Sequence, residues 1–120
     1  MAKKTLVIGA STDPSRYSFL AANKLVSHKH EIELLGVKEG VVAGKEINTE
    51  KEKFEDIDTV TLYVNPQRQS EYFDYVADLK PRRVIFNPGT ENPAFENFLT
   101  EKGIEPIEAC TLVMLSTGQY

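Results

Sequence analysis

Short apolar runs alternate along the chain with segments in which apolar residues recur every three or four positions. The continuous apolar run at residues 6–8 is typical of a strand covered on both faces of a parallel sheet. Residues 57–64, rich in β-branched and aromatic side chains, and the short apolar run 84–86 predict two further strands. Residues 32–37 and 104–107 predict a second strand and a last edge strand. Residues 41–47 predict a loop with a rudimentary strand, and the charged segment 48–55 predicts at best a short surface helix.

Three segments have the spacing of amphipathic helices, at about residues 17–28, 66–79 and 93–102. Both Asn65–Pro66 and Asn92–Pro93 have the order of a capping residue followed by proline at the first helical position. The expected buried stripes are Phe19, Ala22 and Val26 in the first helix, Tyr72, Val76 and Leu79 in the second, and Phe95, Phe98 and Leu99 in the third. A last apolar segment, 112–115, is expected to pack on the core.

Strands that alternate with helices in this way predict βαβ units with right-handed crossovers. We therefore expect a Rossmann-like three-layer α/β sandwich with a mostly parallel sheet of about five strands, formed by residues 1–120 as one domain. Ligands of such sheets lie beyond the carboxyl ends of the strands. This rule brings residues 9–11, Lys38, Asn65–Pro66 and residues 87–92 to one rim.

Composition narrows the classes of function. The 120 residues carry a formal net charge of −4, which argues against general affinity for nucleic acid or for an anionic membrane. No apolar run approaches the roughly 20 residues that span a bilayer, and the first residues lack the features of a signal peptide. We expect a cytoplasmic protein. One cysteine and two histidines provide no set of ligands for a structural zinc ion, so no metal site is expected.

The loop after the first strand has the character of a phosphate-binding turn. Gly9, Ala10 and Ser11 are small and lead into a helix, whose N-terminus offers free N–H groups and partial positive charge. Only Gly9 fits the dinucleotide pattern G-x-G-x-x-G, which weakens an ordinary NAD site. After the second strand, Lys38 stands where an NAD enzyme usually has an acid. Lysine there favours a phosphorylated ribose, as in NADP or in the 3′-phosphate of coenzyme A (CoA).

No catalytic set emerges from the sequence. Cys110 lies among apolar residues, where a lone cysteine is more often a small buried hydrophobe than a nucleophile. His28 and His30 flank the expected end of the first helix, and Ser11 lacks the G-x-S-x-G context of a nucleophile. We expect a protein without catalytic activity of its own.

Four motifs in order, VIGAS with DPSRYS, GKEI, FNPGTEN, and GIE leading to CTLVML, resemble those of the small single-domain CoA-binding proteins. These proteins are similar to the N-terminal CoA-binding domain of the succinyl-CoA synthetase α subunit. The resemblance implies binding of CoA or an acyl-CoA without ligase activity, because the phosphorylated histidine of the synthetase lies in another domain. The binding residues that it implies are Gly9, Ala10, Ser11, Arg16, Tyr17, Ser18, Val37, Lys38, Asn65, Pro66, Asn87, Pro88 and Gly89.

One departure affects the adenosine side of this site, since many relatives have Asn-Pro after the second strand where this chain has Lys38 and Glu39. Three functions remain open. The first is a non-catalytic module that holds CoA or an acyl-CoA and reports it to a protein partner. The second is an NADP- or NAD-binding redox protein or oxidoreductase subunit. The third is a small enzyme acting on a CoA thioester, or a redox sensor in which Cys110 exchanges with the CoA thiol.

Overall fold

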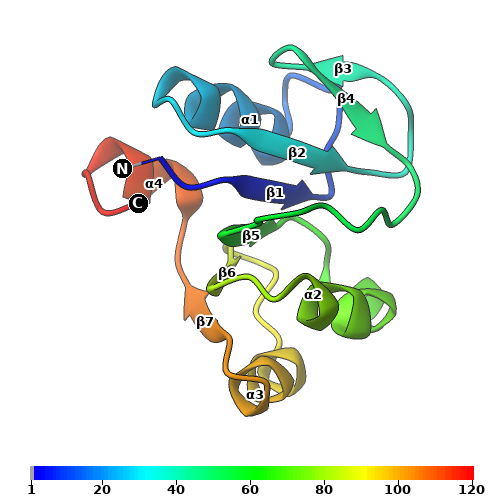
Figure 1. Cartoon of the computed structure of the whole chain (residues 1–120). Helices are drawn as coiled ribbons and strands as arrows, with labels where there is room; N and C mark the ends of the chain where they lie inside the picture. Colours follow the sequence, from blue (N-terminus) through cyan, green and yellow to red (C-terminus); the bar gives the residue numbers. More distant parts are fainter. Residues whose placement is uncertain (1) are drawn as a thin grey trace.

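The computed structural model describes residues 2–120 and contains a central sheet with helices on both faces (Figure 1). Its strands are β1 (Thr5–Ile8), β2 (Ile32–Leu35), β3 (Val41–Val42), β4 (Lys45–Asn48), β5 (Thr59–Leu62), β6 (Arg83–Phe86) and β7 (Glu105–Glu108). Its helices are α1 (Tyr17–Ser27), the 3₁₀ helix η1 (Pro66–Tyr72), α2 (Phe73–Leu79), α3 (Pro93–Glu101) and α4 (Thr111–Ser116).

The strands lie in the order β3-β4-β2-β1-β5-β6-β7, and every neighbouring pair is parallel except β3 with β4. The expected Rossmann-like α/β fold is therefore confirmed. The expected strand number is wrong, because the sheet within residues 2–120 has seven strands rather than about five. The difference lies in residues 41–48, where β3 and β4 form a hairpin at the edge of the sheet. The hairpin joins the sheet through β4, whose Ile47 pairs with Leu34 of β2.

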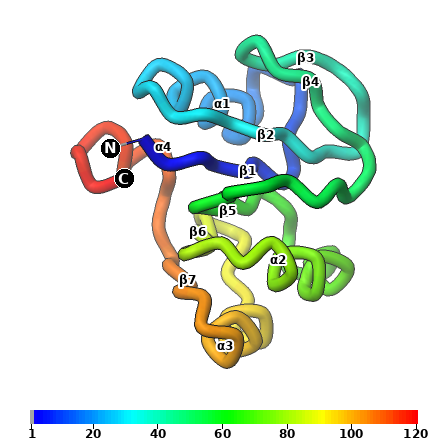
Figure 2. Tube along the Cα trace, viewed as in Figure 1, coloured from blue at the N-terminus to red at the C-terminus, as the bar shows by residue number. Residues whose placement is uncertain are grey.

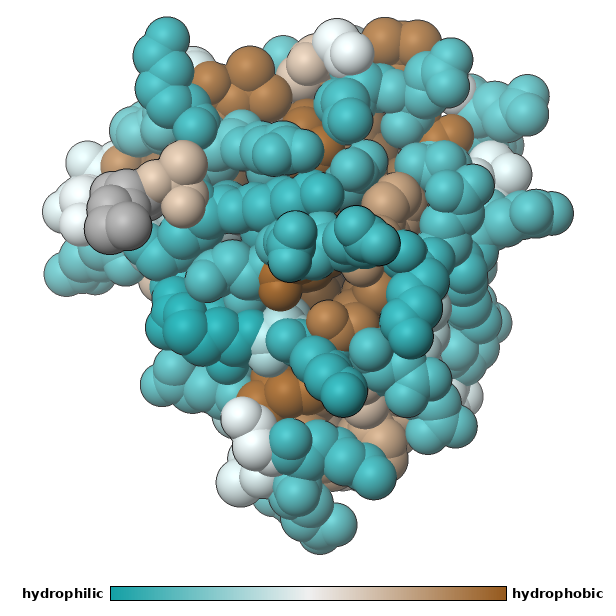
Figure 3. Space-filling model, in the orientation of Figure 1, coloured by the Kyte–Doolittle hydropathy of each residue, from teal (hydrophilic) through white to brown (hydrophobic). Residues whose placement is uncertain are grey.

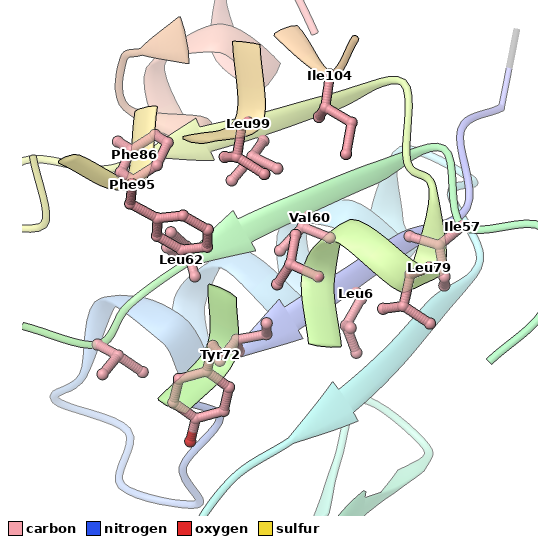
Figure 4. Packing of buried hydrophobic residues seen from close by; sticks show 14 of the residues in the cluster. Leu6, Ile57, Val60, Leu62, Tyr72, Leu79, Phe86, Phe95, Leu99 and Ile104 are labelled. Carbon is pink, nitrogen blue, oxygen red and sulfur yellow. The ribbon is translucent and has the colours of Figure 1, made fainter. Parts of the chain in front are cut away.

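Helices α2 and α3 cover one face of the sheet and enclose a continuous apolar core (Figure 4). Leu62 and Phe86 from the strands meet Tyr72 beside α2 and Phe95 from α3. The Phe86 and Phe95 rings pack edge to face with their centroids 5.5 Å apart, a favourable aromatic geometry. Tyr72, Val76 and Leu79 are buried as the spacing predicts.

The opposite face has two parts. Where α1 packs on β1 and β2, a second apolar cluster includes Val7, Leu25, Leu34 and Leu115 of α4. Over β5 and β6, beside α4 and the end of the chain, the buried side chains are mostly polar. Thr59 and Thr61 of β5 are fully buried there, with Arg83 at 4% exposure. The Nε atom of Arg83 donates to Thr59 Oγ1 at 2.8 Å, and its Nη2 atom donates to the Tyr120 carbonyl at 2.9 Å. A hydrogen bond between the Thr5 and Tyr120 hydroxyls ties β1 to the end of the chain, which lies beside its beginning in Figures 1 and 2. Hydrogen bonds therefore hold the end of the chain against β1, β5 and β6.

The segment 48–55 contains no helix and is largely exposed, in line with the surface segment that was expected. Two other local expectations are wrong. The Asn65 side chain makes no capping bond, and the chain continues as η1 before α2 begins. In α1 the buried line is Ser18, Ala21, Ala22 and Leu25, while Val26 is 40% exposed, because the small alanines let this face approach the sheet. Asn92 does cap α3, accepting from the Phe95 N–H at 3.3 Å.

No helix among residues 2–120 has the length and apolarity that crossing a bilayer requires. Figure 3 shows a mostly hydrophilic face on which the apolar areas are small and separated by polar side chains.

The ring of His30 makes stability depend on pH. Its Nδ1 atom accepts a hydrogen bond from the Lys3 N–H at 2.9 Å, and the ring packs on Tyr120. Burial, followed by the nearby charge of Lys3, lowers the pKa of His30 below its ordinary value. The unfolded chain then takes up the proton first as the pH falls through about 6.5, so the folded state loses stability there.

We expect the free energy of unfolding of the wild type to fall between pH 7.5 and pH 5 by more than that of His30→Asn, which cannot titrate. Urea denaturation at the two pH values measures the difference. His28→Asn, at an exposed neighbouring position, serves as the control and should follow the wild type. Identical pH dependence of the wild type and His30→Asn would contradict the role of this ring.

Candidate ligand-binding cleft

A cleft of about 640 Å³ opens at the carboxyl edge of the sheet, between the loops that follow β1, β2, β5 and β6. This is the edge where the parallel strands were expected to present a ligand site. The predicted site residues that line it are Gly9, Ser11, Arg16, Tyr17, Ser18, Val37, Lys38, Asn65, Pro88 and Gly89. Loops far apart in sequence are thus brought to one hollow.

Three other predicted residues, Ala10, Pro66 and Asn87, are not on the cleft wall. Asn87 is 2% exposed, and its side chain is already engaged within the protein. The amide nitrogen donates to Thr61 Oγ1 at 2.7 Å and to the Leu62 carbonyl at 2.9 Å, and the amide oxygen accepts from the Thr111 N–H at 2.8 Å. Asn87 therefore joins β5, the end of β6 and the start of α4 directly behind the rim loop.

The first loop is held by backbone contacts. The N–H groups of Gly9 and Ala10 both donate to the Leu35 carbonyl, at 2.9 and 3.0 Å. Gly9 has a φ of +95°, and a Cβ there would lie 2.8 Å from the Tyr63 carbonyl oxygen, so the position requires glycine. These two N–H groups are bonded to β2, and the free donors of the loop lie further along the chain.

Those free donors are at the start of α1. Among the described residues, the N–H groups of Tyr17 and Ser18 have no backbone acceptor, as the first turn of a helix requires. Both residues line the cleft. The first turn of α1 contains no acidic side chain, so its partial positive charge is not offset there.

Three cations stand at separate places on the wall. Arg16 precedes α1, Lys38 follows β2, and Arg68 lies in η1. Asp13 approaches Arg16, with 3.8 Å between its Oδ2 and the Arg16 Nε atom. Hydrogen bonds from the N–H and hydroxyl of Ser15 lower the pKa of Asp13 below its ordinary value, so this carboxylate stays ionised at the rim.

Sequence reasoning missed six residues of the wall, namely Asp13, Gly36, Tyr63, Val64, Arg68 and Tyr72, whereas Thr90 lies within the expected rim segment 87–92 and the hydroxyl of Thr12 was expected near the phosphates. Most directly follow a predicted strand or flank a predicted site residue, which is a signal that could have found them. Burial raises the pKa of Tyr63 to about 12, so its hydroxyl remains neutral at physiological pH. Arg68 was expected only as part of a helix.

Gln69 connects the two loops on the far side of the cleft. It is fully buried, and its Nε2 atom donates to the Val64 carbonyl at 2.8 Å and to the Thr90 carbonyl at 2.7 Å. Its Oε1 atom accepts from the Asn92 side chain at 3.0 Å. One side chain thus fixes the loop after β5 against the loop after β6.

A parallel sheet with helices on both faces and a loop-lined cleft at its carboxyl edge defines a Rossmann-like α/β protein. The chain belongs to the family described as the CoA binding domain, whose model matches residues 3–116. A comparison with curated proteins gave no match.

Solved structures agree with this assignment. The chain is 53% identical to a protein whose crystal structure is described as that of an uncharacterized protein, with a TM-score of 0.98 over 100% of this chain and 99% of the other. A protein from Thermus thermophilus is 24% identical, with a TM-score of 0.86 over 99% and 91% of the two chains. A hypothetical protein from Pyrococcus horikoshii OT3 is 23% identical, with a TM-score of 0.88 over 97% and 83%. The latter two similarities concern the fold alone.

We expect Gly36→Ala to lower the free energy of unfolding by about 1–3 kcal/mol, because a Cβ at Gly36 would lie 2.4 Å from the Ala10 carbonyl oxygen. Gly40→Ala is the matched control, since its Cβ would meet only the Thr12 side chain, which can rotate away. Chemical denaturation of both variants measures the costs. If Gly40→Ala lost more stability than Gly36→Ala, the contact between Gly36 and the Ala10 carbonyl would not be the main constraint at this point.

We expect Gln69→Ala to lower the free energy of unfolding by about 2–4 kcal/mol, because it leaves two buried carbonyls and the Asn92 amide without their partner. Gln67→Ala changes an exposed glutamine of the same helix and should cost little. Urea denaturation compares the two variants, and equal stabilities would show that Gln69 does not join the loops.

Proposed function

We propose that the protein binds CoA or an acyl-CoA in the cleft at the carboxyl edge of the sheet and has no catalytic activity of its own. Membership of the CoA binding domain family, across residues 3–116, carries the proposal. The position of the cleft and its chemistry support it. CoA is an anion with three phosphates, and the wall presents Arg16, Lys38 and Arg68 together with free helix N–H groups.

In this proposal the diphosphate lies at the start of α1. Tyr17 and Ser18 supply their free N–H groups, and Arg16 supplies charge. The small residues Gly9 to Ser11 shape the turn and keep side chains out of the way, while the N–H groups of Gly9 and Ala10 stay bonded to Leu35. In this proposal the diphosphate is therefore bound by the first turn of α1, and the loop before it sets the position of that turn.

The adenosine end lies toward β2, where Val37 and Lys38 follow the strand. Val37 is 68% exposed and offers an apolar surface to the base. Lys38 makes no ion pair with any residue among 2–120, so its ammonium group is free for the 3′-phosphate. This arrangement would compensate for the absence of the Asn-Pro found in relatives after the second strand. We further propose a cytoplasmic location and a protein partner that responds to the loaded state.

The test is isothermal titration with CoA, dephospho-CoA and NADPH. We expect CoA to bind more tightly than dephospho-CoA, because only CoA carries the 3′-phosphate. Lys38→Glu should weaken CoA binding about five- to tenfold and remove the difference between the two ligands. Lys29→Glu is the matched control, since Lys29 lies in the turn between α1 and β2, at the opposite edge of the sheet.

Absence of heat with CoA, acetyl-CoA and dephospho-CoA at high protein concentration would overturn the proposal. Tighter binding of NADPH than of CoA would favour a redox protein instead. Equal affinities of the wild type for CoA and dephospho-CoA would leave CoA binding in place and remove Lys38 from the site.

A further inference from the structure

Arg68 is a cation at the end of the cleft remote from Lys38. It lies in η1, after β5, whereas Lys38 follows β2, and the sheet order places β1 between these two strands. Arg68 is exposed on the cleft wall, and no carboxylate among residues 2–120 lies within 4 Å of it. Its charge is therefore open to a ligand.

The backbone that carries Arg68 is rigid. Its N–H donates to the Asn65 carbonyl at 3.1 Å, and the next residue is the buried Gln69, whose side chain makes three hydrogen bonds. The guanidinium group thus projects from a fixed point of the rim. A fixed cation loses less conformational freedom on binding than one on a mobile loop.

The direction of the bound ligand follows from the proposed function, on which this inference rests. With the diphosphate at the start of α1 and the adenosine toward β2, the remaining arm of CoA would follow the cleft toward the loops after β5 and β6. That arm is the uncharged pantetheine, with an acyl group at its end in an acyl-CoA. A free arginine there has no counterpart on CoA itself.

The loops after β5 and β6 bring polar groups to the wall beside Arg68. Asn65 and Thr90 line the cleft together with Val64 and Pro88, and Tyr72 adds a phenol. Tyr72 is 7% exposed, and Figure 4 shows its hydroxyl directed away from the apolar cluster. Such a wall offers hydrogen bonds and a positive charge beside the limited apolar surface of Val64 and Pro88.

We propose that Arg68 makes the cleft selective for acyl-CoA thioesters whose acyl group ends in a carboxylate. The guanidinium group pairs with that carboxylate, and the hydroxyl and amide groups beside it solvate the pair. A thioester that ends in a methyl group leaves the cation without a partner and gains nothing from the polar wall.

Isothermal titration with two matched pairs of ligands tests this: malonyl-CoA against propionyl-CoA, and adipoyl-CoA against hexanoyl-CoA. Within each pair the acyl chains have the same number of carbons and differ in the terminal carboxylate. In at least one pair we expect the carboxylated thioester to bind about fivefold more tightly to the wild type. Arg68→Gln should remove the preference, and Arg68→Lys should keep part of it.

Arg82→Gln is the matched control, because Arg82 precedes β6 at the opposite edge of the sheet and pairs with Asp58. It should retain the preference. Raising the salt concentration should weaken the preference in the wild type, since the pair is partly exposed.

Equal affinities within both pairs, in a wild-type protein that binds them, would overturn this inference and leave the proposed function standing. A preference that survives in Arg68→Gln would also overturn it. If Arg68→Gln weakened CoA binding but not dephospho-CoA binding, Arg68 would instead contact the 3′-phosphate, and the inference would fail. Failure of every thioester and of CoA to bind would overturn the proposed function itself.

Discussion

The close approach of two backbone segments, at the carboxyl ends of β1 and β2, is the constraint on which the cleft depends. The Leu35 carbonyl accepts from two successive N–H groups of the first loop, and Gly36 lies against the Ala10 carbonyl with no room for a Cβ. Gly9 is pressed against the Tyr63 backbone on the other side. The first loop is thus held between the backbone after β2 and the backbone after β5. These contacts set the path of the chain from β1 to α1, and the first turn of α1 lies at the cleft.

Both faces of the sheet have an apolar cluster, and one of them adds a buried polar network. On the α2 and α3 face, aromatic and aliphatic side chains form a continuous core. On the α4 face, buried threonines and Arg83 form hydrogen bonds, and within residues 2–120 no buried side-chain nitrogen or oxygen lacks a partner. Such a satisfied polar network fixes geometry, because each bond has a preferred direction. Asn87 belongs to this network and directly precedes the rim loop, so the packing of α4 bears on the shape of the cleft.

Much of the fold could be predicted from the sequence, because the buried parallel strands are marked by short runs of apolar and β-branched residues. The edge hairpin could not, since β3 has two residues and β4 reads as Lys-Glu-Ile-Asn, with one buried side chain. The 3₁₀ start at Pro66 was also missed. In this helix Gln69 donates to the Val64 carbonyl just before it and to the Thr90 carbonyl in the loop after β6, and the second contact cannot be predicted from the local sequence. The same limit applies to the site: the rim loops were predictable, whereas the position of Arg68 depends on tertiary packing.

The groups that shape the cleft are largely distinct from the groups that would contact a ligand. Backbone contacts at Gly9 and Gly36 and the buried amide of Gln69 set its form, while Arg16, Lys38 and Arg68 are exposed. Substitutions at exposed positions usually change stability little. In an evolutionary sense the scaffold and its specificity are separable: a lineage could exchange the charged side chains on this rim, and so acquire a new ligand, without first having to rebuild the fold.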